Sequence, residues 1–258
     1  MSTLFPPPEQ LSPELWLETP LGQYFLGLEQ AYLDKTVVDI FGYNALQVGF
    51  SQHDLLRASR MSYRATLDRS RGAQIVADRA ELPIVSGSID LLLLPHVLEF
   101  SPTPHQILRE ADRVLVPDGH LVLTCFNPVS LWGLRQALFR ADGFPWQGRF
   151  ISLMRLKDWL ALLGFELVGG SMGCYVPPCR SAKWLGRWEF MESAGDRWWP
   201  FSGALIYLHA QKRVRGMRVI TPRWAQRAPS QSLVSVSQKQ PVVSVGGICC
   251  EAAKTECR

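Results

Sequence analysis

The fold of this chain is decided by residues 90–127, DLLLLPHVLEFSPTPHQILREADRVLVPDGHLVLTCFN. Residues 91–94 form an unbroken apolar run, which is typical of a strand buried on both faces of a parallel sheet, and residues 121–123 form a second such run. Pro104 suits the first position of a helix, and the Pro-Asp-Gly at 117–119 predicts a turn. The helix between them would bury an apolar stripe made of Ile107, Leu108, Ala111, Val114 and Leu115. A helix that joins two buried strands predicts a right-handed crossover in a parallel sheet.

The sequence of this strand–helix–strand segment resembles that of class I S-adenosylmethionine-dependent methyltransferases. It has Val-Leu-Glu-Phe at 97–100, Glu110, Arg-Val-Leu at 113–115 and Pro-Asp-Gly at 117–119. Members of that family commonly carry Val-Leu-Glu-His and an acidic-x-x-Arg-Val-Leu-x-Pro-Gly-Gly turn. The resemblance spans residues 40–212 and concerns the fold more than any substrate. It implies an α/β, Rossmann-like class I methyltransferase fold with a seven-stranded, mostly parallel sheet and helices on both faces.

The composition narrows the class of protein. The chain has 258 residues, 47% of them hydrophobic, and a net charge of +4. No block of like charges stands out before residue 212, so we expect no nucleic-acid partner. The first ten residues lack the basic start and apolar core of a signal peptide, and no apolar run approaches the length of a membrane helix. We therefore expect a cytoplasmic protein without a transmembrane segment. The six cysteines show no short-spaced zinc pattern, and we expect no metal site.

Changes in composition suggest three parts. Residues 1–40 read as an N-terminal arm and helices, residues 41–212 as the methyltransferase-like domain, and residues 213–258 as a basic linker and disordered tail. Within the domain, residues 169–203 form an insertion rich in aromatic residues between the last two predicted strands, 165–168 and 204–210. It would be a cap over an apolar acceptor, a patch for a partner or membrane surface, or a small helix pair packed on the core.

The first predicted strand runs into a loop that departs from the family pattern. Class I methyltransferases commonly carry an acidic-x-Gly-x-Gly-x-Gly signature here. In this chain only Gly49 remains, Gln47 replaces the carboxylate, and Ser51 and His53 replace glycines. The resemblance places Gly49, Phe50 and Ser51 beside the cofactor. His53 is either a ligand contact or a solvated loop histidine.

Three further residues are candidates for the nucleoside end of the cofactor. Asp68 stands 19 residues after Gly49 (68 − 49 = 19), where Rossmann-like folds place an acidic residue on the ribose hydroxyls. A carboxylate suits this role because it can accept two hydrogen bonds from a diol. The alternative is that Asp68 is a plain turn residue. By resemblance, Asp78 would face the adenine amino group with the Arg79 backbone beside the ring. The alternative for Asp78 is a strand-end cap.

Pro95 and His96 follow the buried run at 91–94. Ligands of open parallel sheets bind outside the carboxyl ends of the strands, so Pro95 should line the methyl-transfer side of the pocket. The ordinary pKa of histidine suits a general base, which makes His96 the catalytic candidate. Many methyl transfers need only an aligned acceptor, and then no base is required.

These residues favour an enzyme that transfers a methyl group from S-adenosylmethionine to a small-molecule acceptor. The altered loop keeps a second interpretation open, a non-catalytic relative that uses the fold for binding or scaffolding. A nicotinamide-dependent oxidoreductase is disfavoured because no Gly-x-Gly-x-x-Gly follows a predicted strand. The acceptor and the oligomeric state stay open.

Overall fold

The structure is a computed structural model that describes residues 13–70, 72–138, 143–178, 182–188 and 190–214. The predicted extended arm before residue 13 and nearly all of the predicted tail after residue 212 lie outside these ranges.

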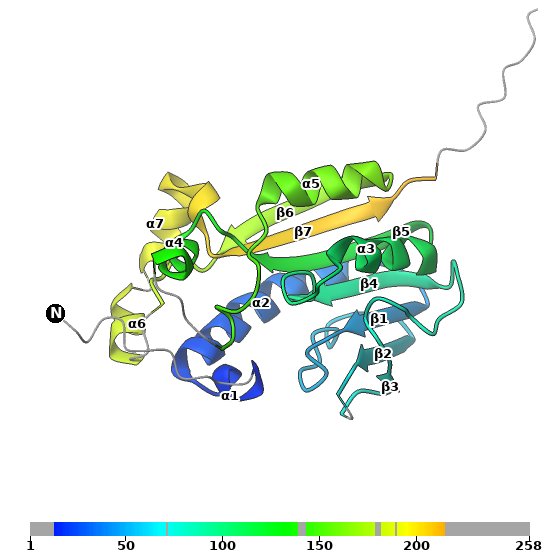
Figure 1. Cartoon of the computed structure of the whole chain (residues 1–258), viewed down its shortest axis with the longest axis horizontal. Helices are drawn as coiled ribbons and strands as arrows, with labels where there is room; N and C mark the ends of the chain where they lie inside the picture. The colour runs from blue at the N-terminus through cyan, green and yellow to red at the C-terminus, as the bar shows by residue number, and fades with distance from the viewer. Residues whose placement is uncertain (1–12, 71, 139–142, 179–181, 189, 215–258) are drawn as a thin grey trace, which may run out of the picture. The chain divides into compact units, whose positions relative to one another are not determined.

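The described residues form one seven-stranded sheet with the order β3-β2-β1-β4-β5-β7-β6. β7 is antiparallel to β5 and to β6, and the other neighbouring strands are parallel (Figure 1). The sheet confirms the predicted Rossmann-like class I methyltransferase architecture. Its strands are β1 (Asn44–Val48), β2 (Tyr63–Asp68), β3 (Ile75–Val76), β4 (Ile89–Pro95), β5 (Leu115–Phe126), β6 (Phe165–Gly173) and β7 (Leu205–Lys212).

The central strand–helix–strand unit confirms the prediction, with one difference. α3 (Pro104–Val114) joins β4 to β5, but the Pro-Asp-Gly at 117–119 does not separate the helix from the strand. β5 already begins at Leu115, and its pairing with β4 shifts between the pairs Ile89–Leu115 and Leu91–His120. The expected turn is therefore an irregularity within the strand, where Asp118 has a φ of 62°.

Both faces of β4 are buried, as its apolar run predicted. Leu91 and Leu93 pack in a cluster with Leu33 and Val37 of α2 (Pro20–Val38). Leu92 and Leu94 pack in the cluster that contains the buried residues of α3 and of α5 (Leu153–Leu162). Helices thus cover both faces (Figure 1), which fixes β4 as the centre of the core. In the described residues between β1 and β4, the chain makes turns rather than regular helices.

Two helices of the described residues precede β1. α1 (Pro13–Leu17) is followed by α2, whose N-cap Thr19 accepts a hydrogen bond from the Gly22 amide at 3.1 Å. A Cβ on Gly22 would lie 2.2 Å from the carbonyl oxygen of Trp16, so the two helices meet backbone to backbone. After β5 the chain forms α4 (Leu131–Leu138).

The aromatic insertion starts later than predicted. β6 continues to Gly173, so the first five residues of 169–203 belong to the edge strand. The rest forms α6 (Ala182–Trp188), α7 (Phe190–Trp198) and a 3₁₀ turn, η1 (Pro200–Ser202). This is the helix-pair alternative, although Trp198, Trp199 and Phe201 are 71%, 61% and 73% exposed. No helix in the described part of the chain is long and apolar enough to cross a bilayer.

A histidine pair across β5 and β7 gives a pH-dependent prediction. His120 Nδ1 lies 2.8 Å from His209 Nε2. Burial, and then the neighbouring His120, lower the pKa of His209 to about 4. As the pH falls, the unfolded chain therefore binds a proton at this position before the folded chain does, and stability declines below the ordinary histidine pKa.

Between pH about 7 and about 4.5, we expect the unfolding free energy to fall by about 1–2 kcal/mol more in the wild type than in His209→Gln. The difference is smaller than the full pKa shift would give because His209 is only partly buried and solvent screens its charge. Urea denaturation at both pH values measures this difference. Parallel losses in the two proteins would contradict the assignment.

Candidate active site

A cavity of about 330 Å³ lies where the carboxyl ends of β1, β2 and β4 meet. Its walls come from the loops after these strands, from α1 and from residues 144–147. It brings together most of the residues predicted from the sequence: Gly49, Phe50, Ser51, Asp68, Arg79, Pro95 and His96. Asp78 is not among the lining residues. The position fits the rule that ligands of parallel sheets bind at the carboxyl ends of the strands.

The loop after β1 is held by Gln47, whose side chain is fully buried. Its Nε2 donates to the carbonyl oxygens of Gly49, Phe50 and His53 at 3.0, 3.1 and 2.8 Å, and its Oε1 accepts from the Leu55 amide at 3.0 Å. The sequence showed only that a carboxylate was missing here. In the structure, Gln47 organises the loop from within and offers no group to a ligand.

Two residues of this loop have left-handed backbone conformations. Gly49 has a φ of 91° and Phe50 a φ of 49°. A Cβ on Gly49 would lie 3.2 Å from Val97 Cγ2 and 3.9 Å from Arg79 Cζ, so the glycine keeps this side of the cavity open. Ser51 Oγ lies 2.9 Å from Ser70 Oγ, which joins the loops after β1 and β2 at the cavity wall. His53 also lines the cavity, and partial burial lowers its pKa.

Asp68 lies at the end of β2 and pairs with Arg79. The guanidinium of Arg79 donates to Asp68 Oδ1 at 3.2 Å from Nε and at 2.7 Å from a terminal nitrogen, and the Arg69 amide donates to the same oxygen at 2.7 Å. Among the described residues, every hydrogen bond to this carboxylate ends on Oδ1, which leaves Oδ2 for a ligand. The side chain of Arg79 therefore enters the site, where the sequence had predicted a role for its backbone.

Asp78 does not line the cavity. Its carboxylate accepts from the Ala80 amide at 3.0 Å and pairs with Arg69, and these contacts lower its pKa, the Ala80 bond most. This is the geometry of a strand-end cap, the alternative that the sequence had left open. Contact with adenine stays a prediction.

His96 follows Pro95 with a φ of 50°, and its side chain has no solvent-exposed surface. The ring is fully buried, with Nδ1 at 2.9 Å from Glu99 Oε1 and Nε2 at 3.6 Å from Glu29 Oε1. The rings of Phe25, Phe50 and Phe126 enclose it, with centroids 5.2, 6.0 and 4.2 Å away. In this conformation Nε2 faces the Glu29 carboxylate rather than a methyl acceptor in the cavity. Catalysis by His96 stays a prediction.

The two glutamates change the charge expected at His96. Burial lowers the pKa of His96, but the carboxylates of Glu29 and Glu99 outweigh it and raise the pKa. Burial raises the pKa of Glu29, against the opposing effect of His96. Sequence reasoning missed Glu29. The available signal was its spacing, because Glu29 lies four residues after Phe25 and four before Leu33, on the buried face of α2.

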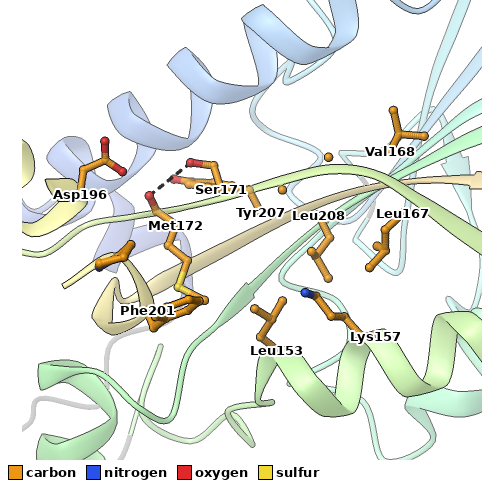
Figure 2. A pocket seen from close by; sticks show the side chains of 13 residues that line it. Leu153, Lys157, Leu167, Val168, Ser171, Met172, Asp196, Phe201, Tyr207 and Leu208 are labelled. Carbon is orange, nitrogen blue, oxygen red and sulfur yellow. Dashed lines mark hydrogen bonds between the residues drawn. The ribbon is translucent and has the colours of Figure 1, made fainter. Parts of the chain in front are cut away.

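A second depression, of about 410 Å³, lies along edge strand β6 (Figure 2). Its walls include Leu153 and Lys157 of α5, residues 167–172 of β6, and Asp196 and Phe201 of the insertion. None of the predicted site residues lines it. The cavity at the ends of β1, β2 and β4 is therefore the candidate active site.

Comparison with known sequences agrees with this geometry. The model of a methyltransferase domain family matches residues 27–123. YafS, an uncharacterized protein of Escherichia coli, is 33% identical over 174 residues, which cover 66% of this chain and 72% of YafS. A malonyl-[acyl-carrier protein] O-methyltransferase of Laribacter hongkongensis is 37% identical over 93 residues, 36% of this chain and 31% of that protein.

Solved structures share the fold at low sequence identity. A SAM-dependent methyltransferase from Thermotoga maritima superimposes with a TM-score of 0.54 at 16% identity, covering 75% of this chain and 99% of that one. A SAM-dependent methyltransferase from Archaeoglobus fulgidus gives a TM-score of 0.51 at 16% identity, covering 73% and 99%. At such identities the likeness shows the arrangement of strands and helices alone.

Proposed function

This chain belongs to the class I S-adenosylmethionine-dependent methyltransferases, and from that premise we propose that it transfers a methyl group from S-adenosylmethionine to a small-molecule acceptor. The observation that carries the proposal is the cavity at the carboxyl ends of β1, β2 and β4, with Gly49 and Asp68 in its wall. Its size lies at the lower end of the range of small-molecule sites, about 300–1,000 Å³.

The residues present fit the nucleoside part of such a cofactor. Asp68 Oδ2 is an acceptor for a ribose hydroxyl, and Gly49 lets the backbone approach the ligand closely. The carboxylate of the family signature is absent, so the methionine part would depend on the backbone of residues 49–51 and on neighbouring polar groups. Arg79, beside Gly49 and Asp68, is a cationic candidate for its carboxylate.

S-adenosylmethionine, when bound, supplies a methyl group that its sulfonium has already activated. The task left to the chain is to orient the acceptor and to exclude water. Phe50, Phe100 and Phe144 line the cavity and contribute its apolar wall. Because the ring of His96 is closed off, orientation rather than proton removal is the role that this conformation supports.

One observation favours the alternative, a non-catalytic relative that binds or scaffolds. Arg79 already pairs with Asp68, and Gln47 already satisfies the carbonyl groups of the glycine loop. A cofactor would have to share the first of these contacts. Direct binding measurements separate the two functions.

Titration calorimetry with S-adenosylmethionine and with its demethylated product, S-adenosylhomocysteine, tests the proposal. We expect the wild type to bind both and Asp68→Asn to bind them about 10–100-fold more weakly, because hydrogen bonds to a charged partner contribute about 1.5–3 kcal/mol. Asp34→Asn is the matched control, since Asp34 pairs with Arg57 on the surface and does not line the cavity.

If the folded protein does not bind either ligand at millimolar concentration, the proposed methyl transfer is overturned and the non-catalytic scaffold is favoured. If Asp68→Asn binds the ligands with wild-type affinity, Asp68 does not contact the ligand. Asp78→Asn adds a third comparison: weakened binding would support contact with adenine, and unchanged binding would support the cap.

A further inference from the structure

The N-terminal helix α2 carries a carboxylate into the core. Phe25, Glu29, Leu33 and Val37 follow at intervals of four residues and are all buried, so Glu29 interrupts an otherwise apolar face. Its Oε1 accepts a hydrogen bond from Thr124 Oγ1 of β5 at 2.6 Å. Burying an ionisable group is costly unless it is paired, so the contacts of Glu29 need an explanation.

His96 provides the pairing, from the opposite side of the helix–sheet interface. It lies between Glu29 Oε1, at 3.6 Å from Nε2, and Glu99 Oε1, at 2.9 Å from Nδ1. The Phe126 amide also donates to Glu99 Oε1, at 2.7 Å. Three atoms of the group have no hydrogen-bond partner in the described part of the chain: Glu29 Oε2, His96 Nε2 and Glu99 Oε2. A buried ion pair whose members keep unsatisfied atoms is weak evidence for stability, which argues for a role of Glu29 beyond stability.

The cluster joins two walls of the candidate active site. Pro95 and His96 form part of the cavity wall, and the His96 amide donates to the Thr124 carbonyl oxygen at 3.0 Å. On the other side, α1 contributes Pro13, Glu14 and Leu17 to the same cavity and leads directly into α2. Glu29 thus links the helices that close the cavity to the turn at the end of β4.

We propose that Glu29 is a positioning residue of the cofactor cavity: with Glu99 it holds His96 as an imidazolium and so fixes the turn at Pro95 and His96 against the N-terminal helices. The role rests on the proposed function, because it takes S-adenosylmethionine to be the ligand of this cavity. The left-handed backbone of His96, at a φ of 50°, is a strained conformation that such contacts stabilise.

The charged state of His96 gives the role a measurable signature. The groups that face the cluster are Glu29 from α2, Glu99 from the segment after β4, Cys125 beside Glu99 on β5, and Tyr207 near Glu29 on β7. Burial raises the pKa values of Cys125 and Tyr207 well above their ordinary values, so neither titrates near neutral pH.

A raised pKa means that His96 stays charged above the ordinary histidine range and loses its proton as the pH rises through the raised value. Ligand affinity should therefore fall as the pH rises through that raised pKa. Removing one carboxylate, as in Glu29→Gln, should move that fall to lower pH.

The experiment measures S-adenosylhomocysteine binding by calorimetry to the full chain between pH about 6 and about 10, for the wild type and Glu29→Gln. We expect the variant to bind about 10-fold more weakly at neutral pH, with the midpoint of its alkaline fall about one unit lower. Glu29→Asp should restore part of both. The control is Glu110→Gln, which breaks a pair with Arg113 on the other face of the sheet and should leave the midpoint unchanged.

Nuclear magnetic resonance titration of His96 in the unliganded protein, assigned with His96→Asn, is independent of the ligand and of how Glu29→Gln folds. A His96 pKa at or below the ordinary value would overturn the proposal, as would equal midpoints in Glu29→Gln and Glu110→Gln. Failure of the wild type to bind either ligand would instead overturn the proposed function, and the positioning role with it.

Discussion

Replacing Gly49 with valine will weaken the binding of S-adenosylmethionine about 100-fold, because the new side chain occupies ligand space and because the left-handed backbone, which costs an ordinary residue about 1–2 kcal/mol, gives way to another loop conformation. The φ of Gly49 is 91°, and its Cβ would point between Val97 Cγ2 at 3.2 Å, the Pro95 carbonyl oxygen at 3.7 Å and Arg79 Cζ at 3.9 Å. Pro95 and Arg79 themselves line the cavity.

Calorimetric titration at neutral pH measures this effect, with Gly27→Ala as its control. Gly27 lies exposed on α2, and a methyl group added there would have nothing within 4 Å, so alanine should leave affinity unchanged and raise stability by about 0.5–1 kcal/mol. Wild-type affinity in Gly49→Val would mean that the ligand does not approach this loop.

Replacing Trp132 with alanine will lower the unfolding free energy by about 3–5 kcal/mol. The Trp132 side chain is fully buried at the centre of an aromatic cluster, 6.0 Å from the ring of Phe126, 6.2 Å from Trp16 and 5.6 Å from Trp146. Its Nε1 also donates to the Val176 carbonyl oxygen at 2.9 Å, which would be left without this donor.

The loss is a large part of the 5–15 kcal/mol that ordinarily stabilises a domain, so chemical denaturation should show it clearly. Trp198→Ala removes the same side chain from a position that is 71% exposed, and it should change stability by less than about 0.5 kcal/mol. Similar losses in both variants would show that the cluster around Trp132 does not hold the α4 region to the sheet.

Local sequence patterns predicted the helices and strands whose own residues form an apolar run or an apolar stripe. The apolar run in β4 and the stripe of α3 each fix an element by its own residues, and both were confirmed. β6 was predicted too short because its last residues, Gly169 to Gly173, are not an apolar run. They become strand by pairing with β7, a partner more than 30 residues away. The residues 117–119 are an irregularity within β5 rather than a turn before it, because the strand pairs with β4 on both sides of them, at Leu115 and again from His120.

The sequence likewise predicted part of the candidate site and missed another part. Spacing from Gly49 was enough to bring Asp68 to the cavity, since the two residues end adjacent parallel strands. It was not enough to place the side chain of Arg79 on Asp68 or to turn the ring of His96 inward. The partners of His96 come from α2 and from the turn after β4, and Glu29 is 67 residues away in sequence. Such contacts depend on how helices dock on the sheet, which no local pattern records.

The hydrogen bonds of Gln47 have a consequence for the kinetics and heat of association. Fixing one residue's backbone costs about 1–2 kcal/mol, and a loop that orders only around its ligand pays this cost at the moment of binding. Here a single side chain already bonds to several points of the segment from Gly49 to Leu55 in the free protein. A ligand would therefore meet a preorganised surface: association should proceed without a slow ordering phase, and the Leu55 amide should exchange with solvent equally slowly before and after binding.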